Sequence, residues 1–79
     1  MTYVYLLQCI ADPSRHYVGI SNDPVRRLEE HNSGKSIHTN KHRPWTIVVS
    51  IGFTDTDKAT AFERYLKSGS GRAFAKKHF

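Results

Sequence analysis

Residues 16–31 read HYVGISNDPVRRLEEH, and this stretch decides how the chain folds. Residues 16–20 combine aromatic and β-branched residues, which favours a strand. Asp23 then begins a helix, because its carboxylate can accept from free N–H groups, and Pro24 fits the first helical position. Gly34 predicts the helix end, since glycine adopts the left-handed conformation that closes many helices. The rest of the chain is arranged around this strand and helix.

The same stretch carries side chains that can build a phosphate site. Tyr17 and Gly19 stand where the strand ends, and a glycine lets a ligand or another backbone approach closely. Arg27 and His31 follow four residues apart on one flank of the helix. Ordinary structural interpretations exist for the three side chains. Tyr17 is a common strand ending, Arg27 is one of several solvated charges, and a protonated His31 can cap the helix C-terminus.

Two further strands are predicted outside this stretch. Residues 2–9, TYVYLLQC, bunch large apolar and aromatic residues, which indicates burial on both faces or a central position. A turn of about six residues, rich in Asp, Pro and Ser, lets this strand pair with 16–20 as an antiparallel hairpin. Tyr3 and Tyr5 point to the same face because side chains alternate along a strand. Residues 45–53, WTIVVSIGF, form a continuous apolar run typical of a buried strand.

The helices are predicted from their apolar positions and their ends. Val25 and Leu28 predict a thin buried stripe along the first helix. N-cap candidates at 54–57 begin a second helix, which runs to about Ser68 and stops at Gly69.

The second helix places one acid at the edge of its inward face. That acid is Glu63, and the apolar residues of the face are Ala59, Phe62 and Leu66. Residues 71–79 are expected to add one or two turns, with Phe74 packing back. The order ββαβα with a short helical tail predicts a single α+β domain over residues 1–79, a small three-stranded antiparallel sheet flanked by helices.

The basic residues are grouped in two segments without acids. The formal net charge is +5, and neither residues 31–54 nor residues 64–79 contain an Asp or Glu. Such segments suit a polyanion, most simply nucleic acid, although many small soluble proteins are basic without binding one. The residues that we expect to contact nucleic acid are Lys35, Lys41, Arg43, Lys67 and Arg72.

Composition excludes several other classes. Cys9 is the single cysteine, so an internal disulfide or a zinc cluster of cysteines is excluded, and a reducing cytoplasm is expected. The chain opens without a basic, apolar leader, and no run is long enough to span a membrane. His38 and His42 lie four apart but in a predicted loop, so they do not predict a zinc site.

Five elements in order now resemble the GIY-YIG nuclease superfamily. Tyr3-Val4-Tyr5 matches its first motif and Tyr17-Val18-Gly19 its second. Arg27, His31 and Glu63 fall on the arginine, histidine and glutamate of the family. Each match alone is weak, but together they cover the whole chain. Within the superfamily, the chain resembles the small bacterial single-domain type. It also resembles the nuclease module found in the nicking subunit of bacterial excision repair and in some homing endonucleases.

The resemblance implies a metal-dependent endonuclease acting on DNA. Glu63 would hold one Mg²⁺ or Mn²⁺ ion, since Mg²⁺ accepts a single carboxylate and keeps much of its water shell. Tyr5 or Tyr17 would activate water, although tyrosine is a poor base at a pKa of about 10 unless a cation such as Arg27 lowers it. Arg27 would bind the phosphate, and His31 would donate to it or relay a proton. This chemistry requires both helices to present Arg27 and Glu63 on the same side of the sheet.

The departures from the family pattern are few. Tyr3 replaces a glycine, Val4 and Val18 replace isoleucines, and the asparagine of larger relatives has no clear counterpart. No separate DNA-binding domain is visible, so cleavage directed by DNA structure or by a protein partner is expected. The substrate would be branched, damaged or single-stranded DNA, with Tyr65 and, less readily, Trp45 as stacking surfaces.

Two other functions compete with the nuclease. One is a nucleic-acid-binding module of the same fold that does not cleave, and the other is a basic protein-interaction domain. Glu63 also has an ordinary structural interpretation, as a surface ion-pair partner of Lys67, four residues on.

Overall fold

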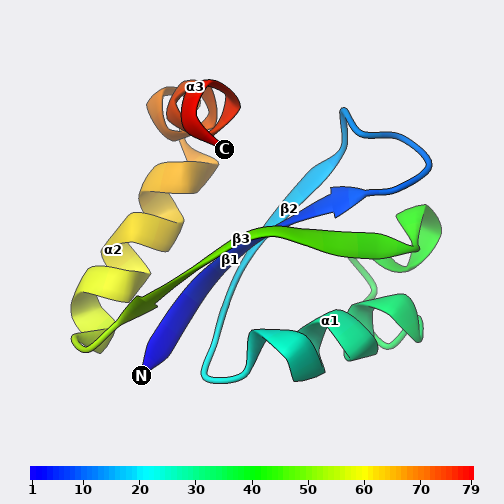
Figure 1. Ribbon diagram of the computed structural model, residues 1–79, viewed down its shortest axis with the longest axis horizontal. Coiled ribbons are helices and arrows are strands. Elements are labelled where there is room, and N and C mark those ends of the chain that lie inside the picture. Colours follow the sequence, from blue (N-terminus) through cyan, green and yellow to red (C-terminus); the bar gives the residue numbers. More distant parts are fainter.

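The protein is a three-stranded antiparallel sheet with helices on both faces. A computed structural model describes residues 1–79. Strands β1 (Thr2–Cys9), β2 (His16–Ser21) and β3 (Trp45–Phe53) are arranged in the order β2-β1-β3 (Figure 1). The predicted α+β class, the hairpin and the bounds of the first and third strands are therefore confirmed.

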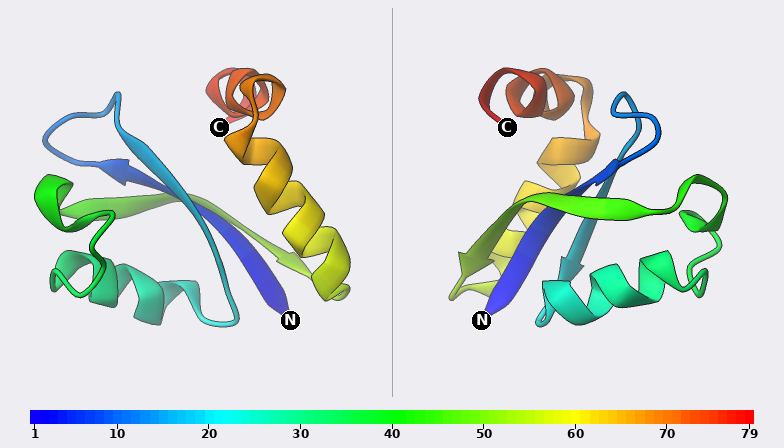
Figure 2. Two further views of the ribbon diagram at one scale, coloured as in Figure 1. Left: turned by 180° about the vertical axis from the view of Figure 1, so that it is seen from behind. Right: turned by 45° about the vertical axis from the view of Figure 1, so that its right-hand side comes forward.

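The central strand divides the core into two layers. Side chains alternate along β1, so Tyr5, Leu7 and Cys9 face one side and Val4 faces the other. Helix α1 (Pro24–Asn32) covers the first side through Leu28. Helices α2 (Thr56–Lys67) and α3 (Gly69–His78) cover the second side (Figure 2). The two helical layers lie apart, with the sheet between them.

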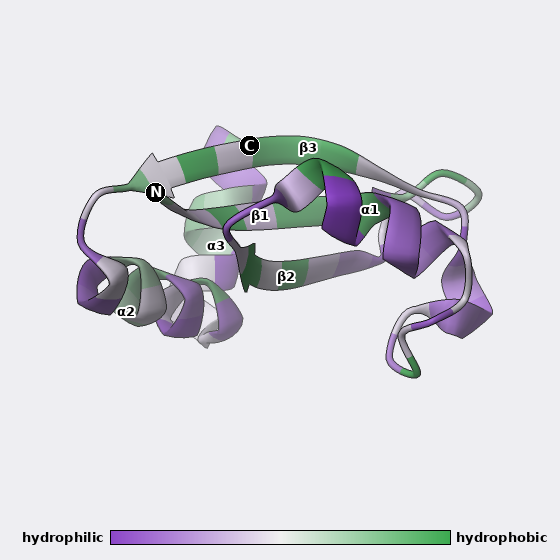
Figure 3. Ribbon diagram, turned by 90° about the horizontal axis from the view of Figure 1, so that it is seen from below, coloured by the Kyte–Doolittle hydropathy of each residue, from purple (hydrophilic) through white to green (hydrophobic).

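Local capping interactions set the start and end of α1. The Asp23 carboxylate accepts from the backbone N–H of Arg26 at 3.2 Å, and Pro24 is the first helical residue. Gly34 lies just past the helix with φ of +82°, as its position predicts. The helix is mostly hydrophilic along its length (Figure 3). Its buried residue is His31, whereas Val25 is 62% exposed, so the predicted stripe of Val25 and Leu28 is wrong at Val25.

Two other predictions need correction. Strand β3 is an edge strand in which Trp45 alone is fully buried, because β1 took the central position between both partners. The tail is a ten-residue helix that begins at Gly69 instead of stopping there. Ser68 makes this corner: its hydroxyl accepts from the N–H of Gly71, which packs too closely against the Tyr65 carbonyl for any side chain. None of the helices has the length and apolar character to cross a bilayer.

The loop between α1 and β3 is held down by a buried tryptophan. The indole Nε1–H of Trp45 donates to the Thr39 carbonyl at 2.9 Å. The Asn32 side chain bonds both backbone groups of Trp45, at 2.6 and 3.0 Å. A short 3-10 turn, Asn40–His42, completes the segment. These bonds fasten a polar loop, which has no periodic pattern of its own, against the end of α1.

Candidate active site

Four of the five family-matched side chains meet on the α1 face of the sheet. Strand pairing sets Tyr5 opposite Gly19 and Tyr17 opposite Leu7, so both tyrosines point to this face. The Tyr5 hydroxyl lies 3.1 Å from Nε2 of His31. The Tyr17 ring lies 5.0 Å from the His31 ring, centre to centre.

Gly19 makes room for this arrangement. A Cβ at residue 19 would overlap the phenol end of Tyr5, including its hydroxyl oxygen. The glycine on the edge strand therefore allows the Tyr5 hydroxyl to reach across to the helix. Any larger residue there would push the phenol away from His31.

Tyr5 carries its proton at neutral pH. Its side chain is 1% exposed, and burial raises its pKa above the ordinary value of 10.0, while the charge of nearby Arg27 pulls the pKa down only in part. Arg27 therefore lowers the pKa of Tyr5, as expected, but burial has the larger effect and the net shift is upward. Desolvation of a phenolate in a small core outweighs one neighbouring cation that is itself partly exposed to water.

His31 is neutral and fully enclosed. It is 0% exposed, and burial lowers its pKa below 6.5, an effect to which the charge of Arg27 adds. Its Nδ1 lies 2.7 Å from the Thr39 hydroxyl, while Nε2 faces Tyr5. A protonated His31 capping the helix is therefore excluded, since both ring nitrogens are already engaged inside the protein.

Arg27 presents a cation to a small cavity. The cavity is about 190 Å³ in volume, and its lining residues are Arg27, Glu30, His31, Lys35, Ser36, Ile37 and His38. The Arg27 guanidinium is 38% exposed and donates to Glu30 Oε1 at 2.7 Å. Glu30 also accepts from Arg26 at 3.2 Å. An oxyanion that enters the cavity meets Arg27 and Lys35, and it competes with the Glu30 carboxylate for Arg27.

Sequence reasoning missed Glu30 and Thr39. Glu30 follows Arg26 and Arg27 at helical spacings of four and three, which was a readable signal for an ion pair. Thr39 stands in a loop without periodicity, and its contact with His31 spans eight residues. Nothing in the local pattern indicates that contact, because it depends on how the loop folds back over α1.

Glu63 does not join the cluster. It lies on α2, across the sheet from α1, and no hydrogen bond or ion pair links it to the tyrosines, Arg27 or His31. Its carboxylate is 14% exposed and pairs with Lys67 at 2.5 Å. The requirement that both helices present Arg27 and Glu63 on one side of the sheet is not met. Helix α2 packs on the face opposite α1, because its apolar residues bury the apolar side chains of that face, such as Val4.

Glu63 lies on the other flank of α2 from Phe62. Helix α2 packs over β1 and β2, and the Phe62 ring lies 5.6 Å from that of Phe53 on β3. Each residue advances about 100° around a helix, so Glu63 stands on the opposite flank of the Ala59–Leu66 ridge from Phe62.

The Glu63 carboxylate can bind a hard cation such as Mg²⁺, but the protein does not supply a complete set of metal ligands. No group of three or more His, Cys, Asp or Glu side chains is arranged to hold a metal among residues 1–79. A single carboxylate such as Glu63 suits Mg²⁺ or Mn²⁺ only when water and substrate oxygens complete the shell. Any metal requirement of this fold would thus be coupled to substrate binding.

The predicted nucleic-acid contacts fall into two groups on different sides of the sheet. Lys35 lines the cavity beside Arg27, Lys41 is exposed in the 3-10 turn, and the Arg43 guanidinium lies against Gly34. Lys67 and Arg72 are exposed on the α2–α3 side. They do not form one continuous patch.

The two candidate stacking residues differ in exposure. Trp45 is buried in the core, which agrees with the less favourable view of it as a stacking surface. Tyr65 is 41% exposed on α2. Of the two, only Tyr65 can offer its ring to a base without unfolding.

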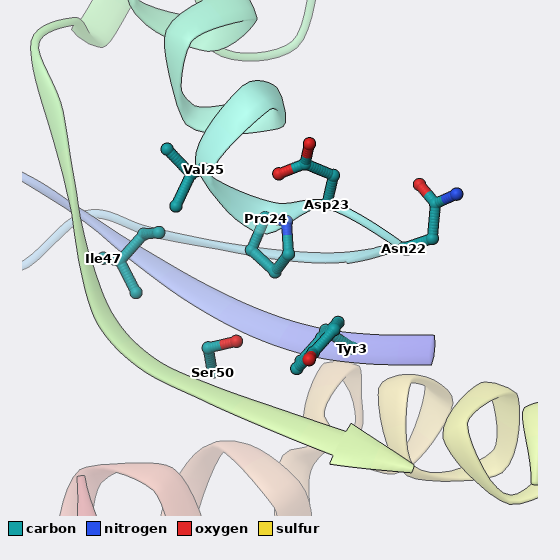
Figure 4. Close-up of a pocket in the computed structure, with 7 residues that line it drawn as sticks. All are labelled: Tyr3, Asn22, Asp23, Pro24, Val25, Ile47 and Ser50. Atoms are coloured by element: carbon teal, nitrogen blue, oxygen red, sulfur yellow. The ribbon is translucent and has the colours of Figure 1, made fainter. Parts of the chain in front are cut away.

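A second cavity is not suited to an anion. It has a volume of about 330 Å³ and lies between the start of α1 and β3, and Figure 4 shows the residues that line it: Tyr3, Asn22, Asp23, Pro24, Val25, Ile47 and Ser50. It contains no cation, and the Asp23 carboxylate is already committed to capping α1. The cavity beside Arg27 is therefore the candidate phosphate site.

Comparisons with known proteins identify the family to which the sequence and fold are similar. The family profile described as the GIY-YIG catalytic domain matches residues 1–77. The structure-specific endonuclease subunit SLX1 of Candida dubliniensis is 42% identical over 71 residues, covering 81% of this chain and 25% of that protein. The chain thus spans about a quarter of the length of this SLX1 relative.

Smaller bacterial relatives match over more of their length. A UPF0213 protein of Streptococcus pneumoniae is 38% identical over 66 residues, covering 82% of this chain and 65% of that protein. The solution structure of a UPF0213 protein of Bacillus halodurans is 31% identical with a TM-score of 0.57, covering 96% of this chain and 81% of that one. Sequence and fold therefore agree on the same group of proteins.

Proposed function

Since the chain belongs to the GIY-YIG nuclease family, we propose that it is an endonuclease that hydrolyses phosphodiester bonds in DNA. The observation that carries this proposal is the buried Tyr5–His31 hydrogen bond beside an arginine-lined cavity. A neutral imidazole that already accepts from a tyrosine can take up a second proton. A partly exposed guanidinium next to it can bind a phosphate.

In the proposed reaction, Tyr5 and His31 act as one base. Tyr5 accepts a proton from the attacking water while its own proton moves to Nε2 of His31, so no free phenolate forms in the core. Burial raises the pKa of Tyr5, so the loss of its proton to water would be unfavourable. Transfer of that proton to His31 in the same step avoids a free phenolate. Burial lowers the pKa of this imidazole below 6.5, but a neutral imidazole is still a better proton acceptor than a neutral phenol.

Arg27 supplies the electrostatic part of the reaction. Its guanidinium can hold a non-bridging phosphate oxygen through two parallel N–H donors once it leaves Glu30. Lys35, on the wall of the same cavity, adds a second positive charge for the extra charge that develops on phosphorus. Tyr17, packed on the His31 ring, would orient the imidazole and contact the substrate.

Glu63 would hold one Mg²⁺ or Mn²⁺ ion. When bound, the ion supplies Lewis-acid stabilisation of the leaving 3′ oxygen. Support for this role comes from the half-buried carboxylate and from the packing of its helix, α2, against β2, the strand that bears Tyr17. Lys67 neutralises the carboxylate until metal and substrate arrive.

We propose that DNA structure or a protein partner, and not base sequence, directs the cleavage. The basic loop residues lie beside the cavity, where they can contact backbone phosphates but do not project a helix into a groove. The SLX1 relatives are described as subunits of a structure-specific endonuclease, which favours branched DNA and a partner protein. Damaged and single-stranded DNA are further candidate substrates.

A second candidate function is a DNA-binding module that does not cleave. The separation of Glu63 from the Tyr5–His31 pair favours it, since a carboxylate engaged by Lys67 serves structure alone in such a protein. A third, a basic domain that binds a protein, predicts no response to DNA structure. Cleavage and salt dependence separate these possibilities.

The test is a panel of labelled duplex, flap, junction and single-stranded DNA, each with and without Mg²⁺ or Mn²⁺. Wild type should nick at least one branched substrate. Glu63→Ala should lose nicking while binding remains, and Arg27→Ala should lose nicking and bind DNA more weakly without losing binding altogether. Glu29→Ala, an exposed acid on α1, is the matched control and should cleave normally. Equal nicking by wild type and Glu63→Ala would refute the catalytic assignment of Glu63.

A further inference from the structure

We infer that Thr39 is a positioning residue that holds His31 in one tautomer, with the proton on Nδ1 and the lone pair on Nε2 facing Tyr5. The inference rests on the proposed function for its catalytic meaning, but its structural content stands by itself. Thr39 would not touch the substrate. It would act through His31.

The contacts that carry the inference are short and enclosed. His31 Nδ1 lies 2.7 Å from Thr39 Oγ1, and Nε2 lies 3.1 Å from Tyr5 Oη. All three side chains are buried, and each of their polar atoms has a partner. In the folded protein, protein groups therefore engage both ring nitrogens, and the ring must satisfy both neighbours with one proton.

The direction of the two hydrogen bonds follows from counting protons. His31 Nε2 is the sole side-chain acceptor within reach of the Tyr5 hydroxyl, while Arg27, also nearby, is a donor only. A protonated Tyr5 must then donate to Nε2, which leaves Nε2 without a hydrogen. A neutral His31 consequently carries its proton on Nδ1, and that N–H donates to the Thr39 hydroxyl oxygen.

The rest of the loop keeps Thr39 in place. Its carbonyl accepts from the Trp45 indole at 2.9 Å, and its N–H donates to the Ser36 carbonyl at 3.3 Å. Trp45 is itself fixed by Asn32, at the end of the helix that bears His31. The helix, the loop and the first residue of β3 thus form one closed set of bonds around the imidazole.

This arrangement matters when His31 accepts the proton from Tyr5. The imidazolium that forms keeps its Nδ1–H on Thr39 while Nε2 holds the new proton, so no rotation of the ring is needed. Without the Thr39 oxygen, the buried Nδ1–H has no acceptor. The ring then favours the other tautomer, in which Nε2 carries a hydrogen and cannot accept from Tyr5.

The experiment compares Thr39→Val, which keeps the shape and removes the hydroxyl, with Thr39→Ser, which keeps the hydroxyl. Thr46→Val, an exposed threonine on β3 without a side-chain hydrogen bond, is the matched control. The first readout is the ¹⁵N spectrum of the His31 ring in DNA-free, metal-free protein, assigned with His31→Gln. The second is single-turnover cleavage of the best substrate alongside its binding constant.

We expect wild type and Thr39→Ser to show a protonated Nδ1 and an unprotonated Nε2, and Thr39→Val to lose that pattern. Cleavage by Thr39→Val should fall by roughly 10- to 100-fold with unchanged DNA binding, since a buried donor loses its partner. Thr39→Ser and Thr46→Val should stay near wild type.

Wild-type protein with the hydrogen on Nε2 would overturn the inference without recourse to any variant, even if Thr39→Val failed to fold. An unchanged His31 spectrum in Thr39→Val would overturn it as well. The predicted nitrogen pattern in a wild-type protein that cuts no DNA would uphold the positioning contact and refute the proposed endonuclease instead.

Discussion

Removal of one oxygen atom tests the Tyr5–His31 pair directly. Tyr5→Phe keeps the ring in the core and deletes the hydroxyl that lies 3.1 Å from His31 Nε2. Because His31 is fully buried, no water can replace the lost donor, and the unsatisfied acceptor costs about 1–3 kcal/mol of stability. For a domain of this size, that loss lowers Tm by roughly 4–24 °C.

The same substitution removes the proposed base. Loss of a positioned acid–base group costs about 10²- to 10⁴-fold in rate, so cleavage by Tyr5→Phe should fall by that factor. Thermal and urea unfolding measure the first effect, and single-turnover cleavage below the Tm of the variant measures the second. Tyr3→Phe is the matched control, because the Tyr3 hydroxyl makes no hydrogen bond within the protein and should change neither quantity.

The two readouts refute different steps. Unchanged stability in Tyr5→Phe would show that the Tyr5–His31 hydrogen bond does not form. Loss of stability with wild-type cleavage would show that the bond forms but that another group, with Tyr17 foremost, activates the water. Only a loss of both agrees with the buried pair as base.

Further predictions follow from the packing and charges of the same cluster. Gly19→Ala should destabilise the fold by about 1–3 kcal/mol in urea unfolding, because its methyl group would overlap the phenol of Tyr5. Stability should fall as pH drops below about 6.5, since the unfolded chain binds a proton at His31 more readily than the folded one; His31→Gln should flatten that dependence in unfolding curves recorded across pH. Glu30→Gln should tighten DNA binding more than Glu29→Gln in a salt titration, although both remove one negative charge, because only Glu30 competes for the cavity arginine; equal effects would mean that net charge alone acts.

Much of the fold was predictable from local chemistry. Strands β1 and β3 begin and end where β-forming residues give way to turn residues, as predicted. Asp23 and Pro24 begin α1, also as predicted. Such signals are local, so they do not depend on what packs nearby. The prediction of the tail failed at Gly69, because the corner is set by Ser68 and by close packing of Gly71 on α2.

Burial was less predictable than secondary structure. The apolar run of β3 indicated a buried strand, yet β3 lies at the sheet edge. Val25 had the right spacing for the core, but its side chain projects into water. His31, on a different face of the same helix, is the residue that is buried. Which residues are covered depends on where α1 settles across the sheet, and hydrophobic periodicity alone does not determine that.

The sequence by itself determined most of the secondary structure, the family and the candidate site residues: two tyrosines, an arginine, a histidine and a glutamate in family order. Only the tertiary structure decided their chemical state. Burial keeps Tyr5 protonated and His31 neutral, and the loop supplies Thr39 to the second ring nitrogen. The structure also set Glu63 across the sheet from Arg27. The physical reason is that protonation and proximity depend on solvent exclusion and on long-range contacts, which arise only when distant segments of the chain pack together.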